Sequence, residues 1–81
     1  MIPAAQLTQR ELEIVSCLVR GMTNREISRE LYVAESTVKA HLHSTFAKLG
    51  VSNRTQAAIV GLALDDLPRP DRDLESAAKA R

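Results

Sequence analysis

The chain has 81 residues, of which 44% are hydrophobic, 26% are charged and only 2% are aromatic. This length allows one small domain, or one domain of a longer protein, with a thin aliphatic core. No apolar run is long enough to span a bilayer and no signal peptide is recognisable, so we expect a soluble, intracellular protein without a membrane partner. The single cysteine, Cys17, excludes an internal disulfide and a cysteine-based zinc site.

The net charge of +1 limits long-range electrostatic attraction. Residues 1–64 carry seven Lys and Arg against five Glu, a balance of +2, whereas residues 65–81 carry four cations and five carboxylates, a balance of −1. No cluster of positive side chains stands out. One copy should therefore attract a polyanion only modestly, and a second copy would double the contact surface.

Two helix starts share one pattern, in which a threonine is followed three residues later by a glutamate. Both are capping boxes, in which each side chain satisfies an otherwise unpaired amide: Thr8 with Glu11, and Thr23 with Glu26. The pattern predicts one helix over about residues 9–20, ended by Gly21, and another over about residues 24–31. The two glutamates are assigned to capping.

An apolar corner at residues 31–33 follows, in which we expect Tyr32 to pack. A third helix is predicted to start near Glu35 or Ser36, without a capping box, and to end at Gly50. At helical spacing its apolar face consists of Val38, Leu42, Thr45, Phe46 and Leu49. The opposite face, with Lys39 at its margin, is small and uncharged at its centre: Ser36, Ala40, His43, Ser44 and Ala47.

A helix, a tight corner and a second two-faced helix are typical of the helix-turn-helix, which lays its second helix into the major groove of DNA. Small side chains let a helix approach the bases closely, and Ala can meet a thymine methyl group. The alternative is an alanine-rich solvent face, since Ala is also the best helix former. The preceding helix and corner favour the DNA interpretation, in which Lys39 contacts guanine.

A fourth helix is predicted over about residues 54–64, capped by Ser52 or Asn53, and it is apolar almost all round. We assign Ala58, Ile59 and Leu62 to the core of the domain. The other side is assigned to a homodimer interface, in which a glycine permits close approach: Ala57, Val60, Gly61 and Leu64. The alternative is that a continuation of the chain, or the charged tail, covers this second side.

The predicted fold class is all-α, a four-helix helix-turn-helix domain with short connections over residues 7–64. No segment alternates with the period of a strand. Residues 65–81, which hold Pro68, Pro70 and nine charged side chains, are predicted to be a flexible charged linker or disordered tail.

No residue pattern indicates catalysis, a metal, a cofactor or a small-molecule site. His41 and His43 are two apart on a helix, so they point to different sides and do not jointly bind a metal ion. There is no nucleophile with a neighbouring base and no glycine-rich phosphate loop. An enzyme is the least favoured class.

Four motifs resemble the LuxR/NarL/GerE-type helix-turn-helix domain of bacterial transcription regulators over about residues 7–64. They are LT..E in the first helix, G.TN.EI in the second, STVK.H in the third and KLGV.NRTQA before and in the fourth. The resemblance implies a bacterial, cytoplasmic protein that binds pseudo-palindromic double-stranded DNA as a homodimer, often through the fourth helix. Such domains are usually output modules of response regulators or ligand-sensing regulators.

The resemblance also implies the residues that contact DNA. Base contacts carry over to Lys39, Ala40 and His43. Phosphate contacts carry over to Thr23 and Asn24 at the second helix, to Ser36 and Thr37 at the third, and to Arg54 at the fourth. A cation such as Arg54 opposes the dipole at a helix start, which an external phosphate would explain. Ala40 and His43 depart from the larger or permanently charged residues common in the family, so the target sequence stays open.

Two other functions remain open from the sequence. The near-neutral charge and the apolar fourth helix would also suit a protein-interaction module that kept this fold without binding DNA. A promoter-reading domain like that of a sigma factor would share the docking geometry and would require RNA polymerase as a partner.

Overall fold

The structure, a computed structural model, describes residues 6–64 and residue 67. Four helices account for most of the described chain: α1 (Gln9–Val19), α2 (Asn24–Leu31), α3 (Glu35–Leu49) and α4 (Arg54–Leu62). Among the described residues there is no strand, which confirms the all-α prediction. The start of each helix is the predicted one, and α1 and α4 end one or two residues earlier than predicted.

Local capping explains where the first two helices begin. The Thr8 hydroxyl accepts a hydrogen bond from the Glu11 amide at 3.1 Å, and the Glu11 carboxylate accepts one from the Thr8 amide at 2.8 Å. Thr23 and Glu26 repeat both bonds at the start of α2. Both predicted capping boxes are therefore confirmed, and each stabilises a helix start by about 1 kcal/mol.

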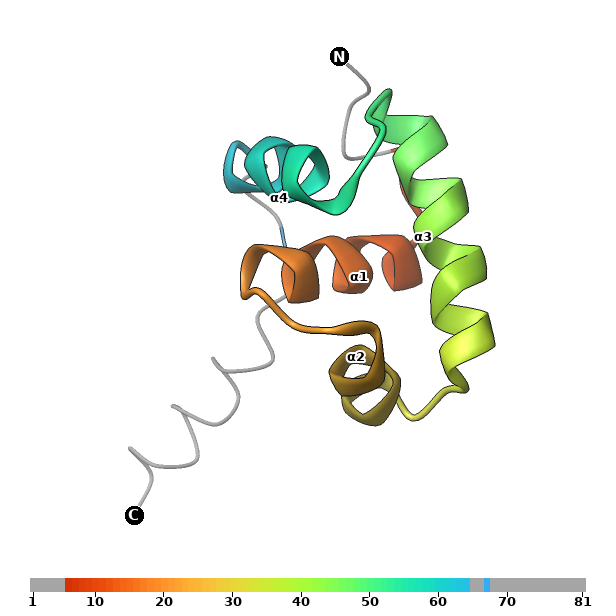
Figure 1. Cartoon of the computed structure of the whole chain (residues 1–81). Coiled ribbons are helices and arrows are strands. Elements are labelled where there is room, and N and C mark those ends of the chain that lie inside the picture. Colours follow the sequence, from red (N-terminus) through yellow and green to blue (C-terminus); the bar gives the residue numbers. More distant parts are fainter. Residues whose placement is uncertain (1–5, 65–66, 68–81) are drawn as a thin grey trace.

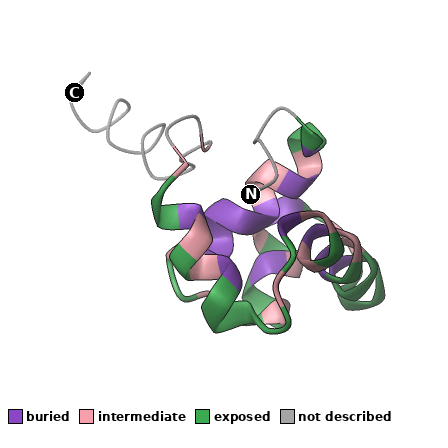
Figure 2. Ribbon diagram, turned by 90° about the horizontal axis from the view of Figure 1, so that it is seen from above, coloured by how far each residue is buried: buried purple, intermediate pink, exposed green. Residues whose placement is uncertain are grey.

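The helices pack around α1, which lies in the middle of the molecule with α4 on one side and α3 crossing its end (Figure 1). Helix α2 packs mainly against α3, so the two form the helix-turn-helix pair. Buried positions face this centre, while the outer sides of α3 and α4 are largely exposed (Figure 2). The core is aliphatic, as expected from the composition: Leu7, Ile14, Val15, Cys17, Leu18, Ile27, Leu31, Val38, Leu42, Leu49 and Ala57.

The packed unit reaches beyond the predicted end of the domain. Leu67, three residues after the predicted last residue Leu64, is partly buried against the core. The remaining residues of the predicted linker or disordered tail, 65–66 and 68–81, lie outside the described part of the chain.

The corner between α2 and α3 differs from its prediction. Tyr32 is 93% exposed, so the expectation that it packs in the corner is wrong. Its backbone has the left-handed values φ 58° and ψ 46°, which end α2 and turn the side chain outward. Such values are unusual for a bulky residue.

Candidate nucleic-acid interface

The outer face of α3 is the surface on which the DNA interpretation depends. Five of its residues are exposed: Ser36, Lys39, Ala40, His43 and Ala47. The inner face is buried at Val38, Leu42, Thr45 and Leu49, with Phe46 partly buried. The prediction that a small, weakly charged side of this helix is left bare is therefore confirmed for these residues.

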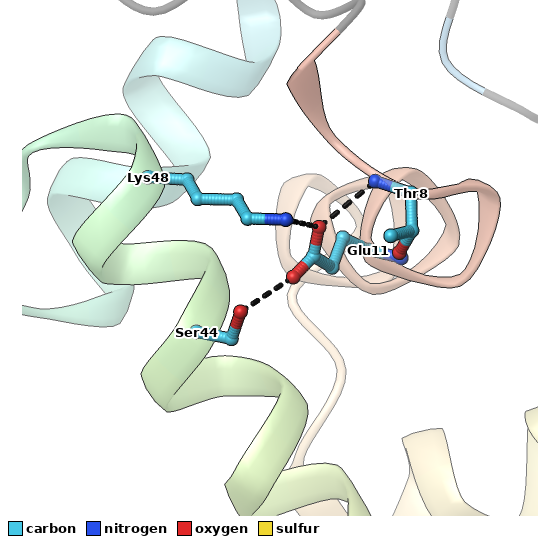
Figure 3. Close-up of polar contacts among 4 residues, drawn as sticks. All are labelled: Thr8, Glu11, Ser44 and Lys48. Atoms are coloured by element: carbon cyan, nitrogen blue, oxygen red, sulfur yellow. Dashed lines mark hydrogen bonds and ion pairs between the residues drawn. The ribbon is translucent and has the colours of Figure 1, made fainter.

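Ser44 is the exception on this face. Its hydroxyl donates a hydrogen bond of 2.6 Å to Glu11 Oε2 in α1, so its assignment to the open side was wrong. Lys48, one turn later, donates to Glu11 Oε1 at 2.8 Å (Figure 3). The same carboxylate also accepts from the amide of Thr8. Glu11 therefore caps α1 and joins it to α3, a second role that its capping motif does not predict.

The charge of Glu11 is stabilised by these contacts although the side chain is buried. Burial raises the pKa of the carboxyl, but the hydrogen bonds from Lys48, Ser44 and Thr8 and the charge of Lys48 outweigh it and lower the pKa to about 2. The carboxylate thus stays ionised at any ordinary pH. Because it holds two residues one turn apart, it fixes the rotation of α3 about its own axis.

The start of α3 is the one helix start in the described chain without a side-chain cap. Its N-cap residue, Ala34, makes no such hydrogen bond, whereas Thr8, Thr23 and Asn53 cap the other three helices. Unpaired amides and the positive end of the helix dipole favour an anion at such a position. The exposed Ser36 and Thr37 lie in the same first turn.

The starts of α2 and α4 are joined by Arg54. Its Nη1 donates to the carbonyl oxygen of Met22 at 2.8 Å, and its Nη2 donates to Asn24 Oδ1. The expected phosphate residues Asn24 and Arg54 therefore lie together, beside Thr23. The Thr23 hydroxyl accepts a hydrogen bond from the Glu26 amide, and the hydrogen bond that the Thr23 backbone amide donates to the Glu26 carboxylate lowers the pKa of Glu26. Arg54 thus has acceptors within the chain, whereas its place at a helix start predicts an external anion.

The two faces of α4 are the reverse of the prediction. Ala57 and Gly61 are buried, and a Cβ atom on Gly61 would lie 2.6 Å from Val15 Cγ1 and 2.8 Å from Val19 Cγ2. The close approach that glycine permits is therefore made to α1 and not to a partner subunit. Val60 and Leu64, the other two residues assigned to the dimer interface, are partly buried against the core.

The exposed side of α4 carries residues that were assigned to the core. Ile59 is 63% exposed and Leu62 is 72% exposed, so their assignment was wrong, while Ala58 is partly buried. In a helix that is apolar almost all round, periodicity does not select the inner face. The glycine was the available signal, because two helices approach most closely where a side chain is missing.

The described residues also bear on three other possibilities, namely a metal site, a membrane-spanning helix and a reactive cysteine. No three His, Cys, Asp or Glu side chains of residues 6–64 and 67 meet as a metal ion would need. No helix there is long and apolar enough to cross a membrane. Cys17 is buried, and burial, with a smaller contribution from the charge of Glu30, raises the pKa of its thiol to about 11.

Comparison with known proteins identifies the same region. Residues 5–60 match the family described as bacterial regulatory proteins, luxR family. The transcriptional regulatory protein LiaR of Bacillus subtilis is 48% identical over 58 residues, which are 72% of this chain and 28% of LiaR. The CsgBAC operon transcriptional regulatory protein of Escherichia coli is 50% identical over 66 residues, 82% of this chain and 30% of that protein.

The spore germination protein GerE of Bacillus subtilis is similar in size to the chain. It is 41% identical over 61 residues, 75% of this chain and 82% of GerE. By contrast, the chain spans less than a third of the length of LiaR and the CsgBAC regulator. The matched residues include α1, α2, α3 and most of α4. The chain belongs to the luxR family of bacterial regulatory proteins, with the DNA-binding helix-turn-helix domain of transcription regulators.

Proposed function

We propose that the domain binds specific double-stranded DNA as a homodimer, with α3 in the major groove. Lys39, Ala40 and His43 contact base edges in this arrangement. The observation that carries the proposal is the exposed outer face of α3, which offers small residues and one permanent cation and no carboxylate between Ser36 and Ala47. A helix with such a face can approach the bases closely, and Lys pairs well with guanine.

Phosphate contacts are proposed at the starts of α2 and α3. Thr23 and Asn24 provide one set and Ser36 and Thr37 the other, and the missing side-chain cap of α3 supports the second set. Phosphates bound at both helix starts would fix the orientation of α3 in the groove. Glu35, exposed in the first turn of α3, works against them and is consistent with modest affinity for one copy.

The homodimer is proposed to form through the exposed side of α4. Ile59 and Leu62 are the large apolar side chains that the described fold leaves most open apart from Tyr32. Ala57 and Gly61, which pack on α1, are not part of this interface. Two copies related by a twofold axis would place their α3 helices about one turn of DNA apart, which matches a pseudo-palindromic site.

The biological role proposed for the domain is that of a DNA-binding output module. LiaR and the CsgBAC regulator are more than three times the length of the matched region. We propose that the domain serves a response regulator or a ligand-sensing regulator in the bacterial cytoplasm, and that bound dimers can contact RNA polymerase. None of the proposed DNA contacts requires a cofactor.

The first experiment selects duplexes bound by the 81-residue protein from a random pool and titrates the recovered duplex. We expect an enriched motif with twofold symmetry. Lys39→Ala should weaken binding to that duplex by about 1–3 kcal/mol and relax preference at one base position. An unenriched pool would contradict specific DNA binding, and unchanged preference in the variant would contradict the base contact by Lys39.

The second experiment tests the homodimer by sedimentation of the protein alone and on the selected duplex. Ile59→Glu should shift the sedimenting species from two copies to one, both in the free protein and on the duplex. The reason is that the apolar contact between the copies would gain an uncompensated charge. Ile59→Leu is the matched control and should retain the dimer. Two copies of Ile59→Glu bound as tightly as the wild type would remove α4 as the interface.

A protein-interaction module is the second candidate, and the exposed Ile59 and Leu62 together with the small net charge favour it. Salt concentration distinguishes the two functions. Binding to the duplex should weaken steeply as salt is raised, whereas an apolar protein contact should change little.

A further inference from the structure

Arg54 makes the contact that joins the starts of two helices distant in sequence. Its guanidinium spans two acceptors of the α2 start, the carbonyl oxygen of Met22 at 2.8 Å and the side-chain oxygen of Asn24. These partners are 32 and 30 residues away along the chain. A cation at the first position of α4 opposes the helix dipole, and the two acceptors offset that unfavourable interaction.

This contact determines which way the Asn24 amide points. A guanidinium carries donors only, so the Asn24 atom that faces Arg54 has to be the carbonyl oxygen. The NH2 group then points away from Arg54, and it has no hydrogen-bond partner among the described residues. Asn24 is partly exposed, at the start of α2 beside Thr23. The side chain therefore offers two donors outward from a helix start that itself favours an anion.

We propose that Arg54 is a positioning residue for DNA binding, which holds the Asn24 amide with its NH2 donors toward a backbone phosphate. The inference rests on the proposed DNA binding and assigns Arg54 a role different from the direct phosphate contact that the family resemblance implies. Arg54 acts through Asn24, and Asn24 touches the phosphate.

The geometry favours this indirect role. Each terminal nitrogen of the guanidinium already donates one hydrogen bond within the chain, so two of its five N–H donors are used, and rotating the group toward a phosphate would break the bonds to Met22 and Asn24. Loss of the Asn24 bond would free the amide to rotate and remove its preferred orientation. A positioned donor loses less conformational entropy on binding than a free one.

A double-mutant cycle on the selected duplex tests the dependence of one residue on the other. Asn24→Ala and Arg54→Lys should each weaken binding by about tenfold, the size expected for a hydrogen bond to a charged group. Lys retains the charge but does not span both acceptors. In the Asn24→Ala background, Arg54→Lys should weaken binding by less than about twofold. If the double variant lost affinity by the product of the two single-variant factors, the two residues would act independently and the proposal would be overturned.

Asn24→Asp separates DNA binding from folding. The carboxylate still accepts from Arg54, so the melting temperature should not fall below that of the wild type. It lacks the outward NH2 donors and carries a negative charge, so binding should weaken at least as much as with Asn24→Ala. Wild-type affinity in Asn24→Asp would exclude an Asn24 donor at the phosphate.

The salt dependence of Arg54→Gln gives a third measurement. A direct ion pair with phosphate contributes about one to the slope of log affinity against log salt, whereas a neutral amide contributes little. We expect Arg54→Gln to have the same slope as the wild type. A slope reduced by about one would instead indicate a direct ion pair between Arg54 and a phosphate. If the wild type shows neither enrichment nor salt dependence, DNA binding itself is contradicted, a result distinct from every variant outcome above.

Discussion

Helices α3 and α4 both pack on α1, but α3 is held by hydrogen bonds and α4 by close apolar packing. Their outer surfaces also differ, since that of α3 is small and polar and that of α4 carries large aliphatic residues. The inner side of α3 is held by the buried carboxylate of Glu11, which bonds Ser44 and Lys48. The inner side of α4 is held by close packing, because Gly61 lets the helix approach Val15 and Val19. Outward, α3 exposes Ala, Ser, His and Lys side chains, whereas α4 exposes large aliphatic ones.

This difference supports the proposal of different partners for the two surfaces, DNA for α3 and a second copy for α4. A polar anchor fixes the rotation of α3, which matters for a helix that must present particular side chains to base edges. Apolar packing positions α4 without such directional bonds, and its exposed aliphatic residues suit another apolar surface. Hydrogen-bonded and close-packed contacts respond differently to mutation and pH. Variants of the α1–α3 contact and of the α1–α4 contact can therefore test the difference between them.

The largest effect is expected on the outer face of α3. Ala40→Glu should weaken binding to the selected duplex by about 100-fold or more, because a carboxylate would face phosphates and base edges. Thermal stability should change by less than about 0.5 kcal/mol, since Ala40 is exposed. Ala40→Ser is the matched control and should bind nearly as the wild type does. Titration by fluorescence anisotropy and thermal melting check both parts, and unchanged affinity would remove this face from the interface.

The hydrogen bonds of Glu11 to Ser44 and Lys48 should make the contact between α1 and α3 more sensitive to pH than the contact between α1 and α4. Glu11→Gln is expected to destabilise the protein at pH 7 by about 2–3 kcal/mol, because Lys48 and Ser44 lose an anionic acceptor. The pKa of Glu11 is lowered from 4.5 to about 2 on folding, so its contribution is complete above pH 4.5 and is lost as pH falls toward 2. Urea unfolding at several pH values should show the two proteins converging in acid. A constant difference across this range would contradict the role of the charge.

One added methyl group at Gly61 should change the stability of the protein, because this residue packs closely against Val15 and Val19 of α1. Gly61→Ala raises intrinsic helix propensity by about 1 kcal/mol, but its Cβ would meet two stiff valine side chains of α1. We expect net destabilisation of about 1–3 kcal/mol without pH dependence. Ala40→Gly, at an exposed position inside α3, measures the contribution of helix propensity alone. A more stable Gly61→Ala protein would mean that α4 can move away from α1 without loss.

The smallest effect is expected at Thr45 on the inner face of α3. Its side chain is fully buried and its hydroxyl oxygen has no hydrogen-bond partner in the described structure. Thr45→Val removes that hydroxyl and keeps the shape, so stability should rise by about 1 kcal/mol. Denaturant titration checks the sign, with Thr45→Ser as the control that should lower stability. A loss in Thr45→Val would show that the hydroxyl is satisfied.

Local sequence was sufficient for the helix starts and for the inner face of α3. Three of the four starts have a signal within a few residues, namely the Thr8 and Thr23 capping boxes and Asn53, and α3, which has no side-chain cap, begins at one of its two predicted residues. The apolar stripe of α3 is long and one-sided, so its period identifies the buried side. The candidate base-contact residues are those that the family motifs imply, and all three are exposed, away from that stripe.

Features that depend on two distant segments were the ones missed. Glu11 is 33 residues from Ser44 and 37 from Lys48, and a capping motif explains a glutamate without any distant partner. Arg54 was assigned an external anion because its partner Asn24 lies on another helix. Tyr32 reads as part of an apolar corner, although its left-handed backbone turns it to solvent.

The sequence by itself determined the four helices, the helix-turn-helix pair, the family and the bare face of α3, because these rest on interactions within a few residues or on a one-sided period. Only the tertiary structure decided which side of α4 is buried, how Glu11 fixes α3 and what Arg54 holds. Those outcomes depend on how helices approach α1 and one another, and short helices that are apolar or polar on several sides carry no local signal for that choice.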